Sequence, residues 1–309
     1  MNSAEVISQA EEVPEGELTI ARRHHPLRWL LALALLWITF AIVRAFATTP
    51  NIDWHTVGSY LFNSDVLAGL EKTLLLTAAA MALAVVLGVI LAVMRLSSNP
   101  VARSFAMGYV WLLRSVPVLV QLIFWYNLAL VFQRVKLGVP DTGLTIAAWQ
   151  TNSVITPLIA AALGLGLAEA AYYSEIVRGG LLGVGDGQQQ AASAIGMTGF
   201  QSFRLIILPQ AMRIIIPPTG NEFIGMLKYT ALASVISYNE LLGTATQIYG
   251  QNGKTIELLL VISFWYIACT TVLTILQSFI ERHFQRGYAP AVGRRSGRLP
   301  WFPKMGSAA

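Results

Sequence analysis

Six stretches of the chain are apolar and long enough to cross a membrane as helices. They are Trp29–Phe46, Thr73–Met94, Ser115–Phe132, Val154–Val177, Ile214–Ser237 and Leu258–Ile280. A spanning helix needs about 20 predominantly apolar residues, and each stretch comes close to this length. The pattern predicts an all-α integral membrane protein with about six transmembrane helices. A further short helix is expected after the fifth span, at Asn239–Tyr249.

The basic residues are distributed unevenly between the two sides that these spans define. If the amino terminus is cytoplasmic, the cytoplasmic segments are residues 1–28, 95–114, 178–228 and 281–309. They hold sixteen of the 21 Lys and Arg residues. Loops on the cytoplasmic side carry such an excess in multi-pass membrane proteins. The pattern therefore predicts that both termini, and the polar segment Gln188–Ala211, are cytoplasmic.

Composition excludes an ordinary soluble domain. Only 12% of the 309 residues are charged, and 55% are hydrophobic, whereas soluble domains carry about 25% charged residues. The net charge of +5 fits cytoplasmic loops better than a nucleic-acid site. Residues 1–25 hold five acids before the first base, which is the wrong charge for a signal peptide. They are predicted to be an acidic disordered tail, and residues 286–309 a basic cytoplasmic tail.

The segment Gln188–Ala211 has the signals of two short helices joined at a glycine. Helix formers continue to Ile195, and Gly196 permits a turn or a close backbone approach. Thr198 is placed to cap a second helix, and Pro209 to begin the next span. The apolar face of this pair comprises Ala191, Ala192, Ile195, Phe200 and Phe203. Two interpretations stay open: the face packs on the bundle as an interfacial loop, or it docks into a groove of a soluble partner.

The same segment resembles the coupling motif of binding-protein-dependent ABC importer permeases. That motif reads Glu-Ala-Ala, three residues, Gly, nine residues, then Ile-x-Leu-Pro. The matching positions are Gln190, Ala191, Ala192, Gly196, Ile206, Leu208 and Pro209. Gln190 departs from the motif, because glutamine keeps the size of glutamate and loses its charge. If the family's acid pairs with a base on the ATPase, this contact is weaker here.

Four further stretches are similar to the polar amino-acid branch of these permeases, the histidine, glutamine and arginine type. They are Gly69–Thr77, Leu112–Tyr126, Ala170–Leu181 and Leu208–Ile236, in the order and spacing of that branch. The resemblance covers residues 65–285 and implies a bundle of five spans. Residues 26–47 then form an extra amino-terminal span.

The resemblance implies a non-catalytic permease subunit of an ATP-driven importer for polar amino acids in the bacterial inner membrane. Residues 185–210 are then the coupling loop, which contacts a dimer of cytoplasmic ABC ATPase subunits. The chain itself binds no cofactor, since ATP and Mg are held by the ATPase. The other expected partners are a second permease subunit (identical or paralogous), an extracytoplasmic substrate-binding protein and membrane lipid, with no nucleic acid.

Ionisable and polar side chains inside the spans are candidates for a substrate pathway. The candidates are Glu169, Gln121, Asn127, Tyr172, Asn221, Glu222 and Lys228. Glu169 stands where the resemblance implies a small or neutral polar residue. A carboxylate there attracts the ammonium or side-chain cation of an amino acid, or pairs with a base of a second subunit. The uncharged candidates equally suit hydrogen bonds between helices. Glu175 is expected to pair with Arg178 on one helix.

Other classes of function are alternatives with less support. An ion-driven secondary transporter predicts inverted repeats, and the two halves of the chain show none. Gly250–Thr255 contains Gly-Lys-Thr but lacks the earlier glycine of a phosphate-binding loop. The four histidines do not cluster, so enzyme chemistry is not indicated. Among importers, the alternative cargo is another small zwitterion or an opine-like solute.

Overall fold

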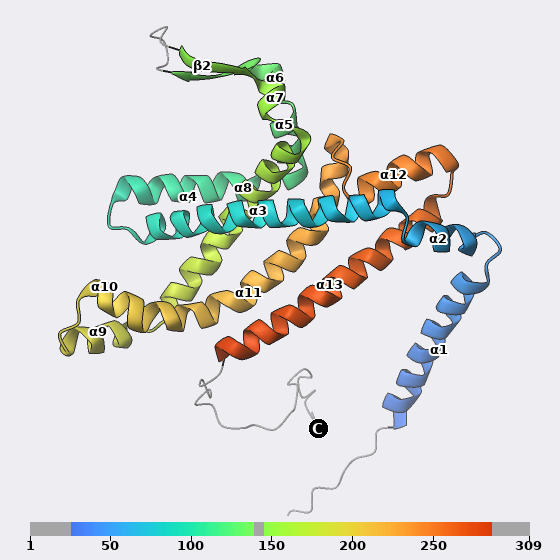
Figure 1. The fold of residues 1–309 in the computed structure, drawn as a ribbon. Helices are drawn as coiled ribbons and strands as arrows, with labels where there is room; N and C mark the ends of the chain where they lie inside the picture. Colours follow the sequence, from blue (N-terminus) through green and yellow to red (C-terminus); the bar gives the residue numbers. More distant parts are fainter. Residues whose placement is uncertain (1–25, 139–144, 286–309) are drawn as a thin grey trace, which may run out of the picture. The chain divides into compact units, whose positions relative to one another are not determined.

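The computed structural model describes residues 26–138 and 145–285, in two units that divide after Ile52. The predicted tails, residues 1–25 and 286–309, lie outside the described residues. The second unit (Figure 1) is helical apart from one hairpin. Its helices are α2 (Trp54–Leu61), α3 (Ser64–Leu96), α4 (Pro100–Ser115), α5 (Val118–Tyr126), α6 (Leu128–Val131), α7 (Thr151–Val154), α8 (Pro157–Leu182), α9 (Asp186–Ala194), α10 (Gly199–Ser202), η1 (Phe203–Ile207), α11 (Leu208–Tyr229), η2 (Thr230–Ile236), α12 (Leu241–Asn252) and α13 (Thr255–Gln285).

The first unit consists of one described helix, α1 (Pro26–Thr48). Its apolar residues are spread around the whole helix and leave no polar stripe. A helix that is hydrophobic all round is suited to lipid or to a protein interior. Leu27–Thr48 is long and apolar enough to cross a membrane. The expected extra amino-terminal helix is therefore present.

The second unit is built around α3 and α8, which pack along each other through small residues (Figure 1). A Cβ atom on Gly166 of α8 would lie 3.0 Å from the carbonyl oxygen of Ala80 on α3. A Cβ on Gly88 of α3 would lie 3.1 Å from the carbonyl oxygen of Ala170. Backbones approach this closely where membrane helices use small residues at their contact. Helices α4, α5 and α11 pack on the other sides of α8.

The predicted third span, Ser115–Phe132, is wrong as a single helix. α4 ends at Ser115, α5 begins at Val118, and their axes differ by 99°. Pro117 has no N–H to donate, and it disfavours the helical conformation at Val116, whose ψ is 128°. The apolar region is therefore two helices with a sharp bend between them, and the pair together has the composition of one span.

The predicted fifth span is also not a continuous α-helix. α11 starts at Leu208, passes into the 3₁₀ helix η2 after Tyr229, and ends at Ser237, whose φ is +60°. The short helix expected next is α12. Glu240 caps it by accepting hydrogen bonds from the N–H groups of Leu242 at 2.9 Å and Gly243 at 2.8 Å.

Three described helices have the length and composition of a membrane span: residues 27–48, 64–96 and 255–284. The bent pair α4–α5 would make a fourth. α8 and α11 occupy the predicted fourth and fifth spans and are 26 and 22 residues long. The chain is thus a predominantly helical membrane protein, while the count of six spans stays a prediction.

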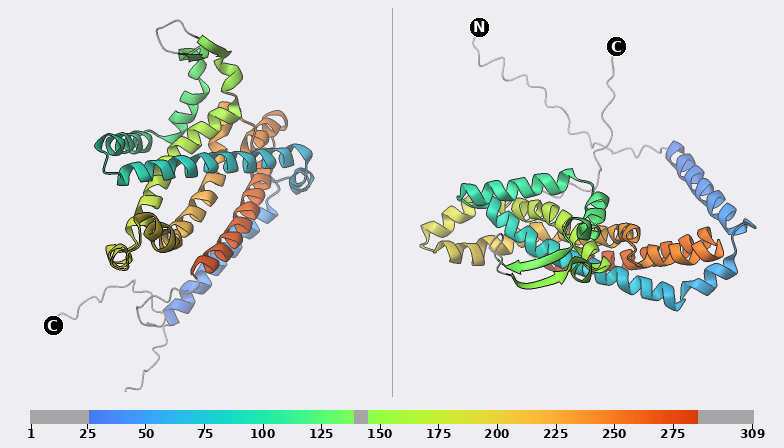
Figure 2. Two further views of the ribbon diagram at one scale, coloured as in Figure 1. Left: turned by 60° about the vertical axis from the view of Figure 1, so that its left-hand side comes forward. Right: turned by 90° about the horizontal axis from the view of Figure 1, so that it is seen from above.

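One feature of the second unit was not expected from the sequence. Strands β1 (Arg134–Gly138) and β2 (Thr145–Gln150) form an antiparallel hairpin between α6 and α7 (Figure 2). The hairpin lies at the opposite end of the unit from α9 and α10. It therefore does not belong to the predicted cytoplasmic loop.

Candidate functional site

The predicted coupling loop folds into two short helices, α9 and α10, that meet at Gly196. The N–H of Gly196 donates to the Ser193 carbonyl at 3.0 Å, and the N–H of Met197 donates to the Ala192 carbonyl at 3.1 Å. This pair of bonds is a Schellman motif, which requires a left-handed residue at the position of Gly196. Gly196 has φ of +79°, and no atom lies within 4 Å of where its Cβ would be. The turn, and not a close approach within the chain, therefore requires the glycine.

The second helix of the loop is fixed by a capping box. The Thr198 hydroxyl accepts from the Gln201 N–H at 3.3 Å, and the Gln201 side chain accepts from the Thr198 N–H at 2.9 Å. The predicted cap at Thr198 is thus confirmed. The chain continues through the π-helical turn η1 into α11. Pro209 stands at this junction and has no N–H to donate to the Leu205 carbonyl.

The apolar face of the loop is left open by the described chain. Ala192 is buried, but Ile195 is 76% exposed and Phe200 is 71% exposed. Gln190, Ala191 and Pro209 are exposed as well, whereas Ile206 and Leu208 are half-buried. Packing on the bundle, the first interpretation of this face, is therefore not what the described residues show.

Two of the predicted pathway residues, Glu169 and Glu222, lie together. Glu169 on α8 is only 6% exposed, and its side chain is adjacent to the carboxyl group of Glu222 on α11. The Glu169 Oε1 atom has no hydrogen-bond partner. Neither acid forms an ion pair with another described residue. A buried polar atom without a partner is a place for a ligand, a water or an ion.

A third candidate, Tyr172, lies one helical turn from Glu169 and is covered by a cation. The guanidinium carbon of Arg114 is 4.8 Å from the centroid of the Tyr172 ring, a cation–π distance. Tyr172 is 40% exposed. Arg114 is exposed as well, so this cation–π pair lies at the surface of the described chain, whereas Glu169 on the same helix as Tyr172 is buried.

Two basic residues that were counted as cytoplasmic lie on helices of the bundle. Arg114 contacts Tyr172, which is ten residues, or about 15 Å along the helix, before the end of α8. Lys228 is 20 residues, or about 30 Å, beyond the start of α11. The contact of α4 with α8 places Arg114 on a helix of the bundle, while the side of the membrane on which each segment lies stays a prediction. Fourteen of the 21 Lys and Arg residues remain in the predicted cytoplasmic segments, so the sign of the excess is unchanged.

Gln121 and Asn127 bond mainly to the backbone. The Gln121 amide donates to the carbonyls of Leu113 and Val116, both at 2.9 Å, and so satisfies the broken end of α4. The Asn127 amide donates to the Ile123 carbonyl of its own helix at 2.8 Å. Gln121 thus bonds to a neighbouring helix, as its alternative role requires, while Asn127 bonds within its own helix.

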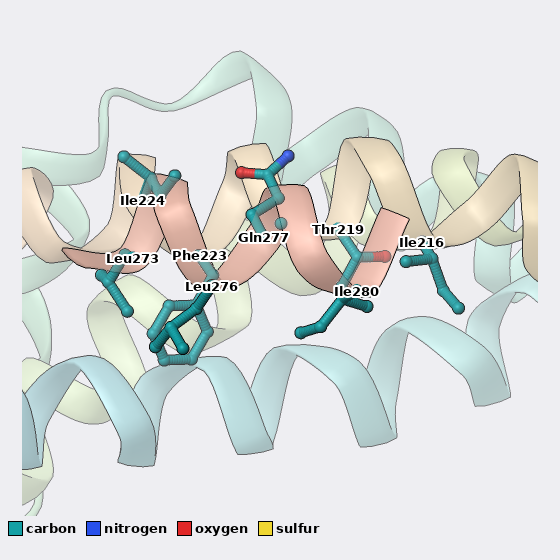
Figure 3. A pocket seen from close by; sticks show the side chains of 9 residues that line it. Ile216, Thr219, Phe223, Ile224, Leu273, Leu276, Gln277 and Ile280 are labelled. Carbon is teal, nitrogen blue, oxygen red and sulfur yellow. The ribbon is translucent and has the colours of Figure 1, made fainter. Parts of the chain in front are cut away.

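Asn221 lies on a different face of α11 from Glu222, against α13. Its side-chain oxygen accepts from Gln277 at 3.1 Å, and Gln277 also donates to the Pro217 carbonyl at 3.2 Å. A groove of about 360 Å³ runs beside Gln277 between α11 and α13 (Figure 3). Its lining is apolar except for Thr219 and Gln277. Because it offers no charged group, the groove does not match a zwitterionic ligand.

Sequence reasoning missed two residues that make contacts between helices, Arg114 and Glu240. Arg114 was assigned to a loop, although the Val116–Pro117 pair next to it signals that a helix ends there. Glu240 was not singled out, yet it is fully buried and also accepts from the Tyr266 hydroxyl at 3.1 Å. Burial raises the pKa of the Glu240 carboxyl, while its bonds to the N–H groups of α12 oppose this shift.

The arrangement has counterparts among known transport proteins. The chain is 41% identical over 265 residues to the arginine transport system permease protein ArgU of Corynebacterium glutamicum. The alignment covers 85% of this chain and 82% of that protein. It is 35% identical over 232 residues to the glutamate/aspartate import permease protein GltK of Escherichia coli, covering 75% and 98%. A crystal structure of an amino acid ABC transporter with histidines matches with a TM-score of 0.64 and 32% identity, over 75% of this chain and 99% of that one.

The fold and these likenesses define a helical membrane component of an ABC transport system. Residues 84–286 match the family described as binding-protein-dependent transport system inner membrane component. The chain belongs to this family. It is therefore a non-catalytic permease subunit of an ABC importer, as the coupling motif and the four further stretches indicated.

Proposed function

We propose that this permease imports polar amino acids and receives its driving force through the loop at residues 185–210. In this proposal residues 65–285 form the translocation domain, and both termini and the loop are cytoplasmic. The loop contacts a dimer of ABC ATPase subunits. A second permease subunit completes the pathway, and a substrate-binding protein delivers the cargo from outside.

The observation that carries the proposal is the open apolar tip of a rigid loop. Ile195 and Phe200 are 76% and 71% exposed, while the Schellman turn and the capping box fix the backbone between them. Exposed apolar side chains on a fixed helix pair suit helix-in-groove recognition. A rigid loop also transmits a displacement of its partner to α8 and α11, the two helices that it joins.

The docking proposal is tested by removing one apolar side chain from the tip. Phe200→Ser is expected to weaken the association with the ATPase by roughly 10- to 100-fold, because burying an aromatic side chain contributes about 1.5–3 kcal/mol. The matched control is Ile146→Ser, since Ile146 is 79% exposed on β2 at the other end of the unit. Association is measured by titrating the purified ATPase onto the permease in mild detergent. Equal affinities for the two variants would exclude the tip as the contact.

The cargo is proposed from the buried Glu169 and the half-buried Glu222. An unpaired carboxyl oxygen of Glu169 next to Glu222 favours a solute that carries a cation and opposes one that carries extra negative charge. Both arginine and glutamate/aspartate permeases are among the relatives, so the likeness alone does not select the cargo. The pair of acids supports a basic amino acid, such as the arginine of ArgU. Competition for uptake tests this preference: arginine is expected to compete best, glutamine less well and glutamate least.

A further inference from the structure

Three arginines from three helices line one hollow at the end of α3. Arg95 is in the last turn of α3, Arg103 in the first turn of α4, and Arg178 one turn before the end of α8. The hollow has a volume of about 320 Å³. One acid, Glu175, lies beside it, so these four side chains carry two positive charges in excess.

The acid leaves most of the guanidinium donors unused. Glu175 Oε2 accepts from the Nε atom of Arg178 at 2.8 Å, as the spacing of the two residues predicted, and Oε1 accepts from Arg95. Arg103 forms no side-chain hydrogen bond or ion pair with another described residue. A guanidinium has five N–H donors in a planar fork that fits phosphate. The hollow therefore suits an anion with several oxygens.

Besides the arginines, the hollow is lined by Ser97 and by three exposed apolar side chains. Leu96, Met107 and Leu182 line it and are 41%, 42% and 59% exposed. The uncharged apolar run of α3 ends at Met94, directly before Arg95, and the helix ends at Leu96. The hollow therefore lies where we expect the hydrocarbon layer to meet the polar interface. Acyl chains would cover these side chains, whereas a free phosphate would leave them open.

We propose that this hollow binds an anionic phospholipid, with the phosphodiester held by Arg95, Arg103 and Arg178. Basic pockets between membrane helices on the cytoplasmic side bind anionic lipid headgroups. The apolar wall favours a lipid over free phosphate, and the excess charge favours an anionic over a zwitterionic lipid. The site requires only that α3 and α8 are embedded in a membrane, so it does not depend on the docking of the loop or on the cargo.

The test is native mass spectrometry of the assembled transporter, purified in mild detergent. It is titrated with phosphatidylglycerol or with phosphatidylcholine of the same acyl chains. The unmodified protein is expected to bind phosphatidylglycerol more tightly. Arg103→Gln, which leaves the Glu175 ion pairs intact, is expected to weaken this binding by about fivefold to tenfold. The matched control Arg282→Gln removes the same charge from the end of α13 and is expected to leave it unchanged.

Three results would overturn the assignment. Equal binding of the two lipids, or an equal effect of Arg103→Gln and Arg282→Gln, would exclude a specific headgroup site. Displacement of the lipid by millimolar inorganic phosphate would identify a free anion as the ligand. Binding of phosphatidylglycerol to the isolated chain but not to the assembled transporter would identify the hollow as a contact with a partner protein. Thermal unfolding of each variant checks that the fold is retained.

Discussion

Substitution of Gly196 separates a conformational role of this glycine from a steric one. Its φ of +79° is required by the Schellman turn, and a left-handed conformation costs an ordinary L-residue about 1–2 kcal/mol. Asparagine adopts this conformation more readily than alanine, and β-branched residues adopt it least. Alanine is therefore expected to reduce the population of the native turn by roughly 5- to 30-fold. Asparagine should reduce it less, and valine more.

The apparent affinity for the ATPase should fall in the same proportion, because only the native turn presents the docking face. The expected order is glycine, asparagine, alanine, valine. It is measured as binding of the ATPase to the permease and as substrate imported per ATP hydrolysed in proteoliposomes. The bundle should unfold at an unchanged temperature, since Gly196 has no atom within 4 Å of its Cβ position.

A different order would refute this reasoning. If the partner's backbone must approach Gly196 closely, the size of the side chain determines the affinity for the ATPase, and alanine is tolerated better than asparagine. An affinity for Gly196→Asn below that for Gly196→Ala would therefore show that space, and not the positive φ, explains the glycine. Full coupling in Gly196→Val would exclude both explanations.

Two further substitutions test the buried residues Glu169 and Glu240. Glu169→Gln is expected to raise the KM for arginine uptake by roughly 10-fold or more, because one interaction with a charged group is lost. The KM for glutamine uptake should rise less. An equal change for both solutes would show that Glu169 does not contact the substrate. Glu240→Ala is expected to destabilise the protein by about 2–4 kcal/mol, because a helix cap is lost and the Tyr266 hydroxyl loses its partner. Thermal unfolding in detergent measures this, and an unchanged unfolding temperature for Glu240→Ala would show that this cap does not stabilise the fold.

Hydropathy was sufficient to predict that the chain forms long apolar helices and insufficient to predict where they bend. The run Ser115–Phe132 is uniformly apolar, so it satisfied the length criterion for a span. Pro117 nevertheless breaks it, because the ring removes a donor and restricts Val116. The Val116–Pro117 pair was a local signal for this break, but a criterion based on apolar length alone does not take it into account.

The features of the loop were predictable because they are local. Gly196 and Thr198 act on neighbours within five residues, and both do what their residue types suggest. The pairing of Glu169 with Glu222 was not predictable in this way. The two acids are 53 positions apart in the sequence, and only the packing of α11 on α8 places them together. The same holds for Arg114, whose place beside Tyr172 depends on α4 running along α8.

The two acids and the loop are connected by the same two helices. α8 carries Glu169 about 20 Å before its end at Leu182 and then leads into α9. α11 begins at Leu208 and carries Glu222 about 21 Å from its start. A displacement of the loop must therefore act on both helices that hold the acids. Because the Coulomb interaction between two carboxylates in a low-dielectric bundle depends strongly on their separation, a small relative shift of α8 and α11 changes how well the pair holds a cation. A ligand can bias such a two-state bundle only by its differential affinity for the two packings. In the function proposed above, a cation held between Glu169 and Glu222 would supply that difference at one end, and the ATPase would supply it at the other.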